Sequence, residues 1–227
     1  MSLFAIGDLH LSGAKEKPMG IFGKTWENHT EKIKKNWTKI VKDEDTVLIT
    51  GDISWAMTLN EVKIDLDFIA ALPGRKILIK GNHDYWWSSV SKLNSMYENM
   101  VFLQNNFAIY KDIAICGSRG WENPEGNKAD AKTYKREIGR FNLSLETAVK
   151  AGYNRIFFMS HYPPLWKEQK ESGLFNVLKE HSVEKVFYGH LHGEDSFKTG
   201  ESGIVCGVKL ILVSADFLKF IPFKIME

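Results

Sequence analysis

The sequence predicts a layered α/β domain in which short buried strands alternate with helices. Short apolar runs, rich in β-branched and aromatic residues and bounded by glycine, recur along the chain. Segments with apolar residues at helical spacing lie between these runs. Several runs also end in Asp, Asn or His, and sheets of this class place ligands beyond the carboxyl ends of their strands.

Five apolar runs are predicted to be the strands of this domain. They are rich in Ile, Leu, Val and Phe, which suits strands buried on both faces. The predicted strands are residues 3–6, 47–50, 77–80, 156–159 and 186–188.

Helices are expected in the intervals between the strands. The best-marked helix begins at Thr58, which forms a capping box with Glu61, and ends near Leu72 before a Pro-Gly pair. The other predicted helices are residues 26–42, 88–98 and 130–151. Hairpins are expected over residues 107–116 and 204–225.

The composition is typical of a globular protein. The chain has 227 residues, of which 44% are hydrophobic and 26% charged, so a sizeable core can form and disorder is not expected. Its length favours a single domain over residues 1–227. No apolar run approaches the ~20 residues of a transmembrane helix, so no membrane partner is expected.

Charge and cysteine content exclude further classes. The net charge is +2, from 30 basic and 28 acidic residues. This balance does not support an extended nucleic-acid-binding surface. Cys116 and Cys206 match no metal-binding or redox spacing. Reduced thiols and the absence of a secretory signal at the start of the sequence predict a cytoplasmic protein.

Histidines and carboxylates gather at the predicted strand ends. The motifs are Asp8-Leu9-His10, Gly51-Asp52, Gly81-Asn82-His83-Asp84, Ser160-His161 and Gly189-His190-Leu191-His192. Taken singly, an Asp or Asn beside Gly is more often part of a turn than a ligand. In an extended segment residues i and i+2 point to the same side, so Asp8 with His10, and His190 with His192, could each hold one ion.

Together these motifs predict a metal centre. Two Asp, one Asn and four His supply nitrogen and oxygen donors without sulfur, which suits manganese, iron or zinc rather than calcium. Seven donors exceed one ordinary site, but they suit two ions that share a bridging carboxylate.

The ordered motifs resemble those of the calcineurin-like metallophosphoesterase superfamily. The family pattern is D-x-H, G-D, G-N-H-[DE], a lone His and G-H-x-H, and all five occur in order between residues 8 and 192. The resemblance implies a four-layer α/β/β/α sandwich, in which two mixed β-sheets pack face to face with helices outside. It also implies two divalent or trivalent transition-metal ions, Mn, Fe or Zn, at the carboxyl edge of the sheets.

The resemblance implies a role for each motif residue. Asp8, His10 and His192 would hold one ion, Asn82, His161 and His190 the other, and Asp52 would bridge them. His83 would be the general acid and Asp84 would position it. The implied activity is hydrolysis of a small phosphomonoester or phosphodiester, a nucleotide among the candidates, by attack of a hydroxide that bridges the ions.

Two other functions stay open on the same fold. One is a metal-binding scaffold or interaction protein that has lost turnover. The other is a nuclease. The segment from His190 to Asp195 also resembles the H-x-H-x-D-H string of a different family, the metallo-β-lactamase-type hydrolases. The segment departs from that string at Glu194 and Asp195, which stand in place of Asp and His.

Aromatic and basic residues surround the motifs and could select the substrate. The aromatic residues Trp26, Trp55, Tyr85, Trp86, Trp87 and Trp121 could stack a nucleobase or fill the core under the loops, and the second role is the commoner one. Residues 12–24 and 117–128 form loops long enough to act as lids. The basic residues of these loops that could contact phosphate are Lys15, Lys17, Lys24, Arg119 and Lys128.

Overall fold

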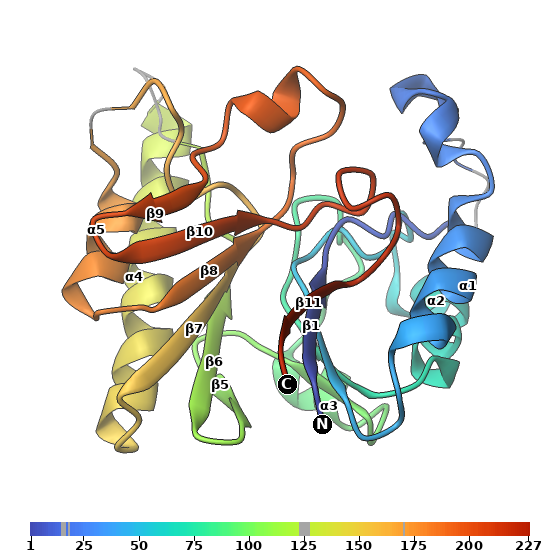
Figure 1. Ribbon diagram of the computed structural model, residues 1–227, viewed down its shortest axis with the longest axis horizontal. Coiled ribbons are helices and arrows are strands. Elements are labelled where there is room, and N and C mark those ends of the chain that lie inside the picture. Colours follow the sequence, from blue (N-terminus) through green and yellow to red (C-terminus); the bar gives the residue numbers. More distant parts are fainter. Residues whose placement is uncertain (15–16, 18, 123–127, 170) are drawn as a thin grey trace.

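Two β-sheets lie face to face at the centre of the computed structural model, which describes residues 1–14, 17, 19–122, 128–169 and 171–227 (Figure 1). The first sheet contains, in spatial order, β11 (Phe223–Met226), β1 (Leu3–Ile6), β2 (Thr46–Ile49), β3 (Arg75–Leu78) and β4 (Met100–Phe102). Strands β1 to β4 are parallel and β11 is antiparallel to β1, so the sheet is mixed.

The second sheet is mixed as well. It contains, in spatial order, β5 (Phe107–Tyr110), β6 (Ile113–Ser118), β7 (Arg155–Ser160), β8 (Lys185–Tyr188), β10 (Val208–Leu212) and β9 (Gly203–Val205). The inner strands β6, β7, β8 and β10 are parallel, and β5 and β9 are antiparallel edges.

Helices cover the outer face of each sheet (Figure 1). The first sheet carries α1 (His29–Ile40), α2 (Leu59–Ala71) and the short α3 (Val90–Asn94), and the second carries α4 (Lys128–Lys150) and α5 (Gly173–Glu180). The 3-10 helices are η1 (Met19–Phe22), η2 (Lys24–Trp26) and η3 (Ser196–Lys198). The predicted four-layer α/β/β/α arrangement is therefore confirmed.

Alternation along the strands divides the core into three layers. In β1, Leu3 and Ala5 face the second sheet, whereas Phe4 and Ile6 pack under the helices of the first sheet. All four side chains are nearly or fully buried, because a strand between a sheet and a helix layer is covered on both sides.

The carboxyl ends of both sheets meet at one edge. Gly7, just after β1, forms a parallel bridge with Ser214, just after β10. The Gly7 amide donates a hydrogen bond to the Val213 carbonyl at 2.7 Å, and the Ala215 amide donates one to the Gly7 carbonyl at 3.0 Å. The polar residues that follow the strands of the two sheets are thereby brought to the same place.

Most predicted elements lie where the sequence indicates. The capping box at Thr58 is present, with its hydroxyl accepting from the Glu61 amide and the Glu61 carboxylate accepting from the Thr58 amide. The helix predicted over 88–98 spans only α3, and the side chain of its last residue, Asn94, hydrogen-bonds to the Phe102 backbone of β4. Strand β4 and helix α5 were not predicted.

The predicted hairpin over residues 204–225 is only partly correct. Its first half is the hairpin of β9 and β10, which turns at Cys206 and Gly207 with positive φ at both residues. Its second half, β11, instead crosses to the first sheet and pairs with β1. The crossing occurs at Ser214, where the two sheets are joined, and local pattern does not encode that contact.

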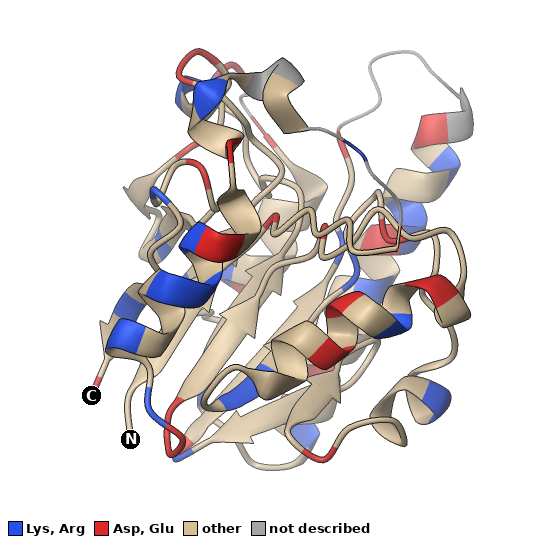
Figure 2. Ribbon diagram, turned by 90° about the vertical axis from the view of Figure 1, so that its right-hand side faces the viewer, with Lys and Arg blue, Asp and Glu red and all other residues tan. Residues whose placement is uncertain are grey.

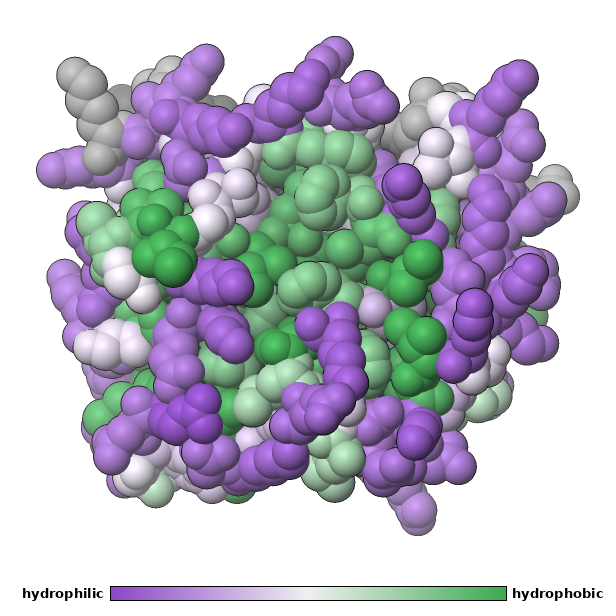
Figure 3. All heavy atoms as spheres, in the orientation of Figure 1, coloured by the Kyte–Doolittle hydropathy of each residue, from purple (hydrophilic) through white to green (hydrophobic). Residues whose placement is uncertain are grey.

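The surface differs between the two faces pictured. Most charged residues of α1 are lysines, whereas most charged residues of α2 are acidic (Figure 2). Hydrophobic residues gather in the middle of the face in Figure 3, over β10, β11 and the segment between them. The exposed Phe217 and Ile221 belong to that segment, and the exposed Phe223 begins β11. Among the described residues, no helix is long and apolar enough to cross a membrane.

Candidate metal centre

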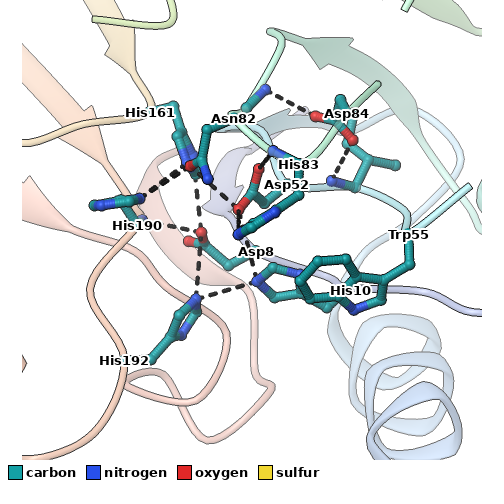
Figure 4. A network of polar contacts seen from close by, with 12 residues as sticks. Asp8, His10, Asp52, Trp55, Asn82, His83, Asp84, His161, His190 and His192 are labelled. Carbon is teal, nitrogen blue, oxygen red and sulfur yellow. Dashed lines mark hydrogen bonds and ion pairs between the residues drawn. The ribbon is translucent and has the colours of Figure 1, made fainter. Parts of the chain in front are cut away.

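The nine predicted site residues converge at the shared edge of the two sheets (Figure 4). They come from segments that follow β1, β2, β3, β7 and β8. Parallel strands deliver the residues after their carboxyl ends to one side, so five separated motifs form one cluster.

One donor set consists of Asp8, His10 and His192. The Nε2 atoms of His10 and His192 are 3.1 Å apart, and His192 Nε2 is 3.7 Å from Asp8 Oδ1. One ligand atom from each residue lies within 4.8 Å of the others. Ligand atoms bound ~2.1 Å from one ion lie roughly 3–3.5 Å apart, so these donors need little movement to share a cation.

The other donor set consists of Asn82, His161 and His190. Asn82 Oδ1 is 2.6 Å from His161 Nε2 and 3.1 Å from His190 Nδ1. The two imidazole nitrogens are themselves 3.3 Å apart. Three donors therefore point at one small volume, as a second ion would require.

Asp52 lies between the two sets. Its Oδ2 atom is 3.8 Å from His10 Nε2 and 3.5 Å from His161 Nε2. Its Oδ1 atom accepts a hydrogen bond from the His83 amide at 2.8 Å, which fixes the carboxylate. A carboxylate oxygen that faces both donor sets has the placement that a bridging ligand needs.

The backbone is specialised to present these ligands. Asp8, His10, Asp52 and His190 all have positive φ, which is uncommon for residues other than glycine. Such conformations cluster at functional sites, where the surrounding structure supports them. A Cβ atom on Gly81 would overlap the Asp52 carboxylate, so the motif needs glycine there.

Burial shifts the protonation of the donors. It raises the pKa of Asp8 to about 8 and raises the pKa of Asp52. It lowers the pKa of His10 and of His161, which are therefore neutral at pH 7. Asp8 Oδ2 is also buried without a hydrogen-bond partner among the described residues. Neutral imidazoles and an unsatisfied carboxylate oxygen fit two transition-metal ions.

His83 lies at the mouth of the cluster. Its Nε2 atom is 3.9 Å from Asp52 Oδ2, and its side chain is 36% exposed. The ring packs on Trp55, with the ring centroids 4.4 Å apart. Burial lowers the pKa of His83, and the Asp52 carboxylate acts in the opposite direction. The imidazole is thus beside the donors and open to a bound molecule.

The hydrogen bonds of the Asp84 carboxylate go to backbone amides and to the Trp86 indole, and none joins it to the His83 ring. Oδ1 accepts from the amides of Ile53 at 2.9 Å and Ser54 at 3.2 Å, and Oδ2 accepts from the Gly81 amide at 2.8 Å. Burial raises the pKa of Asp84 to about 7. The residue thereby joins the loop that carries Asp52 to the loop that carries His83.

The sequence matches the family model of calcineurin-like phosphoesterases over residues 1–194, which include all nine site residues. The chain belongs to the calcineurin-like phosphoesterase family. Members of this family are hydrolases. The metallo-β-lactamase-type alternative is thereby excluded. Glu194 and Asp195, the two residues that depart from its string, are both exposed.

Relatives of this phosphoesterase include two proteins described as probable cyclic nucleotide phosphodiesterases. They come from Ruthia magnifica subsp. Calyptogena magnifica and Vesicomyosocius okutanii subsp. Calyptogena okutanii (strain HA). Each is 25% identical to this chain over 230 residues, and the alignments cover 96% of this chain and 87% and 88% of the relatives.

Two crystal structures share the fold. Phosphopantetheinyl Hydrolase (PptH) from Mycobacterium tuberculosis matches with a TM-score of 0.56 and 15% identity, over 99% of this chain and 95% of that one. The protein AQ665 from Aquifex aeolicus matches with a TM-score of 0.52 and 17% identity, over 98% and 95%.

Aromatic side chains support the imidazoles of the phosphoesterase site. Trp55 stacks on His10 with ring centroids 4.8 Å apart, and Tyr162 lies 4.0 Å from His190. Of the aromatic residues singled out in the sequence, Trp26, Trp55 and Trp86 are buried, Trp87 and Trp121 half-buried, and Tyr85 exposed. Most of them therefore fill the core beside the site.

The basic residues of the two candidate lids lie in different places relative to the site. Lys17 Nζ lies 3.5 Å from the centroid of the Trp55 ring, above the site. Lys24 is exposed, and Arg119 lines a separate cavity. Lys15 and the side chain of Lys128 lie outside the described residues.

Asp216 is a site residue that the sequence analysis missed. Its Oδ1 atom is 3.1 Å from His192 Nδ1, and its Oδ2 atom accepts from the Gly193 amide at 3.2 Å. Burial opposes protonation of His192, but the hydrogen bond to Asp216 and the nearby charges of Asp8, Asp216 and Asp52 together raise the His192 pKa. Asp216 follows β10, so the same signal of a polar residue after an apolar run was present.

Replacing Asp216 with Asn should weaken metal binding by about 10–100-fold, because a carboxylate behind a ligating histidine orients the ring and raises its basicity. Metal affinity measured by competition with a chromophoric chelator checks this. The matched control is Asp195→Asn, which removes an exposed carboxylate that pairs only with Lys198 among the described residues. Equal affinities of the two variants would refute the positioning role.

Proposed function

We propose that this protein is a dinuclear metal-dependent phosphodiesterase for small nucleotide-type substrates. The observation that carries the proposal is the pair of donor sets that share access to Asp52. Asp8, His10 and His192 would hold one ion, Asn82, His161 and His190 the other, and Asp52 would bridge them. Two such ions would supply a hydroxide nucleophile at neutral pH and neutralise charge on the phosphate.

His83 would act as the general acid. It lies beside Asp52, is not a member of either donor set, and has an imidazole edge open to a bound molecule. An anionic ester against this ring would favour the protonated imidazole, which could then transfer its proton to the leaving oxygen. Trp55 under the ring would restrict its orientation.

The substrate class rests on the relatives, which are described as probable cyclic nucleotide phosphodiesterases. A scaffold without turnover is disfavoured, because every donor position is filled and His83 is present. A nuclease is disfavoured by the net charge of +2. We likewise propose a single domain over residues 1–227, and the cytoplasmic location stays a prediction.

A substrate panel tests the proposal. Protein stripped with a chelator would receive Mn²⁺, Fe²⁺ or Zn²⁺, and hydrolysis of 2′,3′- and 3′,5′-cyclic nucleotides, bis-p-nitrophenyl phosphate and p-nitrophenyl phosphate would be measured. We expect metal-dependent turnover with diesters preferred, and Asp52→Asn protein prepared in parallel controls for contaminating enzymes. No turnover by protein shown to contain two ions would overturn the enzymatic proposal. Preference for monoesters would overturn the diester assignment.

Metal binding should release a proton and weaken as the pH falls below 8. Burial raises the Asp8 pKa to about 8, so at lower pH an ion must displace a proton from this carboxyl. His10 and His161 have lowered pKa values and contribute no displaced proton near pH 7. The Asp8 proton alone should lower the apparent affinity by up to about tenfold per pH unit, and His192, whose pKa is raised, should add to this fall. Calorimetry in buffers of different ionisation enthalpy counts the protons, and an affinity independent of pH between 6 and 8 would contradict the prediction.

A further inference from the structure

A cationic cavity of about 370 Å³ lies beside the metal centre but shares none of its proposed ligands. It is bordered by the segment after β3, by the end of β6 and by one face of α4. Four cationic side chains line it: Lys80, Arg119, Arg136 and Arg140. No carboxylate is among its described lining residues.

A carboxylate next to the cavity, that of Glu137, is already engaged. It is fully buried, and its Oε1 atom is 2.7 Å from Arg140 Nη1. Its Oε2 atom accepts from the Ser118 hydroxyl at 2.8 Å and from the Gly120 amide at 3.2 Å. One carboxylate thus neutralises at most one of the four cations.

Arg119 has no side-chain hydrogen bond to any residue that the structure describes. Its side chain is only 16% exposed, Glu137 Oε1 is 3.9 Å from Nη2, and the guanidinium carbon lies 4.4 Å from the centroid of the Trp121 ring. Its Nε atom is buried with no partner in the part of the chain that the structure describes. A buried guanidinium normally has acceptors around it, because unsatisfied donors cost free energy.

Lys80 and Arg136 also have no hydrogen bond or ion pair within the described ranges. Arg136 and Arg140 are four residues apart on α4, where like charges on one helical face repel. The four cations therefore destabilise one another unless an anion lies between them.

We propose that this cavity binds a phosphate-class oxyanion. Guanidinium groups donate paired hydrogen bonds to phosphate oxygens, and several cations together suit a dianion better than a single carboxylate. The half-buried Ser88 and the exposed Ser89 add hydroxyl donors at the rim. The cavity volume leaves room for part of the molecule that carries the phosphate.

The cavity and the metal centre are connected through the backbone. Lys80 lies two residues before Asn82, and the Arg119 carbonyl accepts from the amides of His161 at 3.0 Å and Tyr162 at 2.9 Å. The anion could be a remote phosphate of the substrate or free inorganic phosphate. This inference goes beyond the proposed function, and it does not require that the protein hydrolyse diesters.

Calorimetric titration with inorganic phosphate tests the site. Metal-loaded protein would be titrated first. The titration would then be repeated after chelation, which removes the metals and with them any phosphate bound there. We expect a binding event that survives chelation and is weakened at least about tenfold by Arg136→Gln and by Lys80→Gln, as expected for loss of one charge-assisted contact. The matched control is Lys135→Gln, which removes an exposed charge of α4 that does not line the cavity.

A kinetic comparison distinguishes the two sources of the anion. KM would be compared for the dinucleotide ApA and its 5′-phosphorylated form pApA, in wild type and Arg136→Gln. A KM ratio that changes about tenfold in the variant assigns the cavity to a remote substrate phosphate, and an unchanged ratio with weakened phosphate binding assigns it to the free anion. Absence of phosphate binding after chelation, or equal affinities of Arg136→Gln, Lys80→Gln and Lys135→Gln, would overturn the proposal. The calorimetric result does not depend on hydrolysis, so it stands or falls separately from the proposed function.

Discussion

Replacing Asp52 with Asn is expected to empty both halves of the metal centre. Asp52 Oδ2 faces His10 of one donor set and His161 of the other, so the substitution removes a charge from both. An amide is a weaker ligand than a carboxylate, and the loss of affinity should exceed the 10–100-fold typical of residues behind the ligands. Elemental analysis after dialysis should find less than one ion per chain.

The Asp52→Asn protein should still fold. Asn retains an oxygen that can accept from the His83 amide, as Asp52 Oδ1 does. Burial raises the Asp52 pKa, so in metal-free protein a neutral side chain should be tolerated at least as well as the carboxylate. Thermal unfolding of chelated samples checks this, with Asp67→Asn as the control, because Asp67 is an exposed carboxylate of α2. Full retention of two ions by a folded variant would refute the bridging role.

Replacing His83 with Ala should reduce turnover by about 10²–10⁴-fold on esters with alkoxide leaving groups, because such groups need a proton as they depart. The loss should be much smaller on an aryl ester such as bis-p-nitrophenyl phosphate, whose leaving group is stable as an anion. Steady-state rates on both substrates, measured with saturating metal, make the comparison.

Metal content distinguishes the general acid from a ligand. His83 belongs to neither donor set, so His83→Ala should keep both ions, in contrast to Asp52→Asn. His181→Ala serves as the matched control, because His181 follows α5 and contacts Asn142 instead of the site. Equal losses on the alkyl and aryl substrates would exclude His83 as the general acid.

The three variants Asp52→Asn, His83→Ala and Asp216→Asn have separable signatures. The first loses both ions, the second keeps them and becomes sensitive to the leaving group, and the third binds them more weakly. Arg136→Gln is expected to differ from all three, because its cavity shares no residue with the metal centre. Together these variants test each part of the edge at which the two sheets meet.

Local sequence determined the strands and the residues that follow them. The apolar run of residues 3–6 is strand β1, and the capping box at Thr58 begins α2, because both depend on neighbours a few residues away. The site motifs could be found in the same way, since each ligand lies within four residues of the end of a strand. Their order along the chain then indicated the family.

Tertiary structure decided which distant groups meet. Asp216 reaches His192 only because β10 lies beside β8, and β11 joins the first sheet only because the sheets are bridged at Gly7 and Ser214. Asp84 bonds to the loop after β2 and not to the His83 ring, although the two residues are adjacent in sequence. The cationic cavity likewise combines Lys80 with residues of α4. These contacts depend on the packing of one sheet against the other, which short-range patterns in the sequence do not specify.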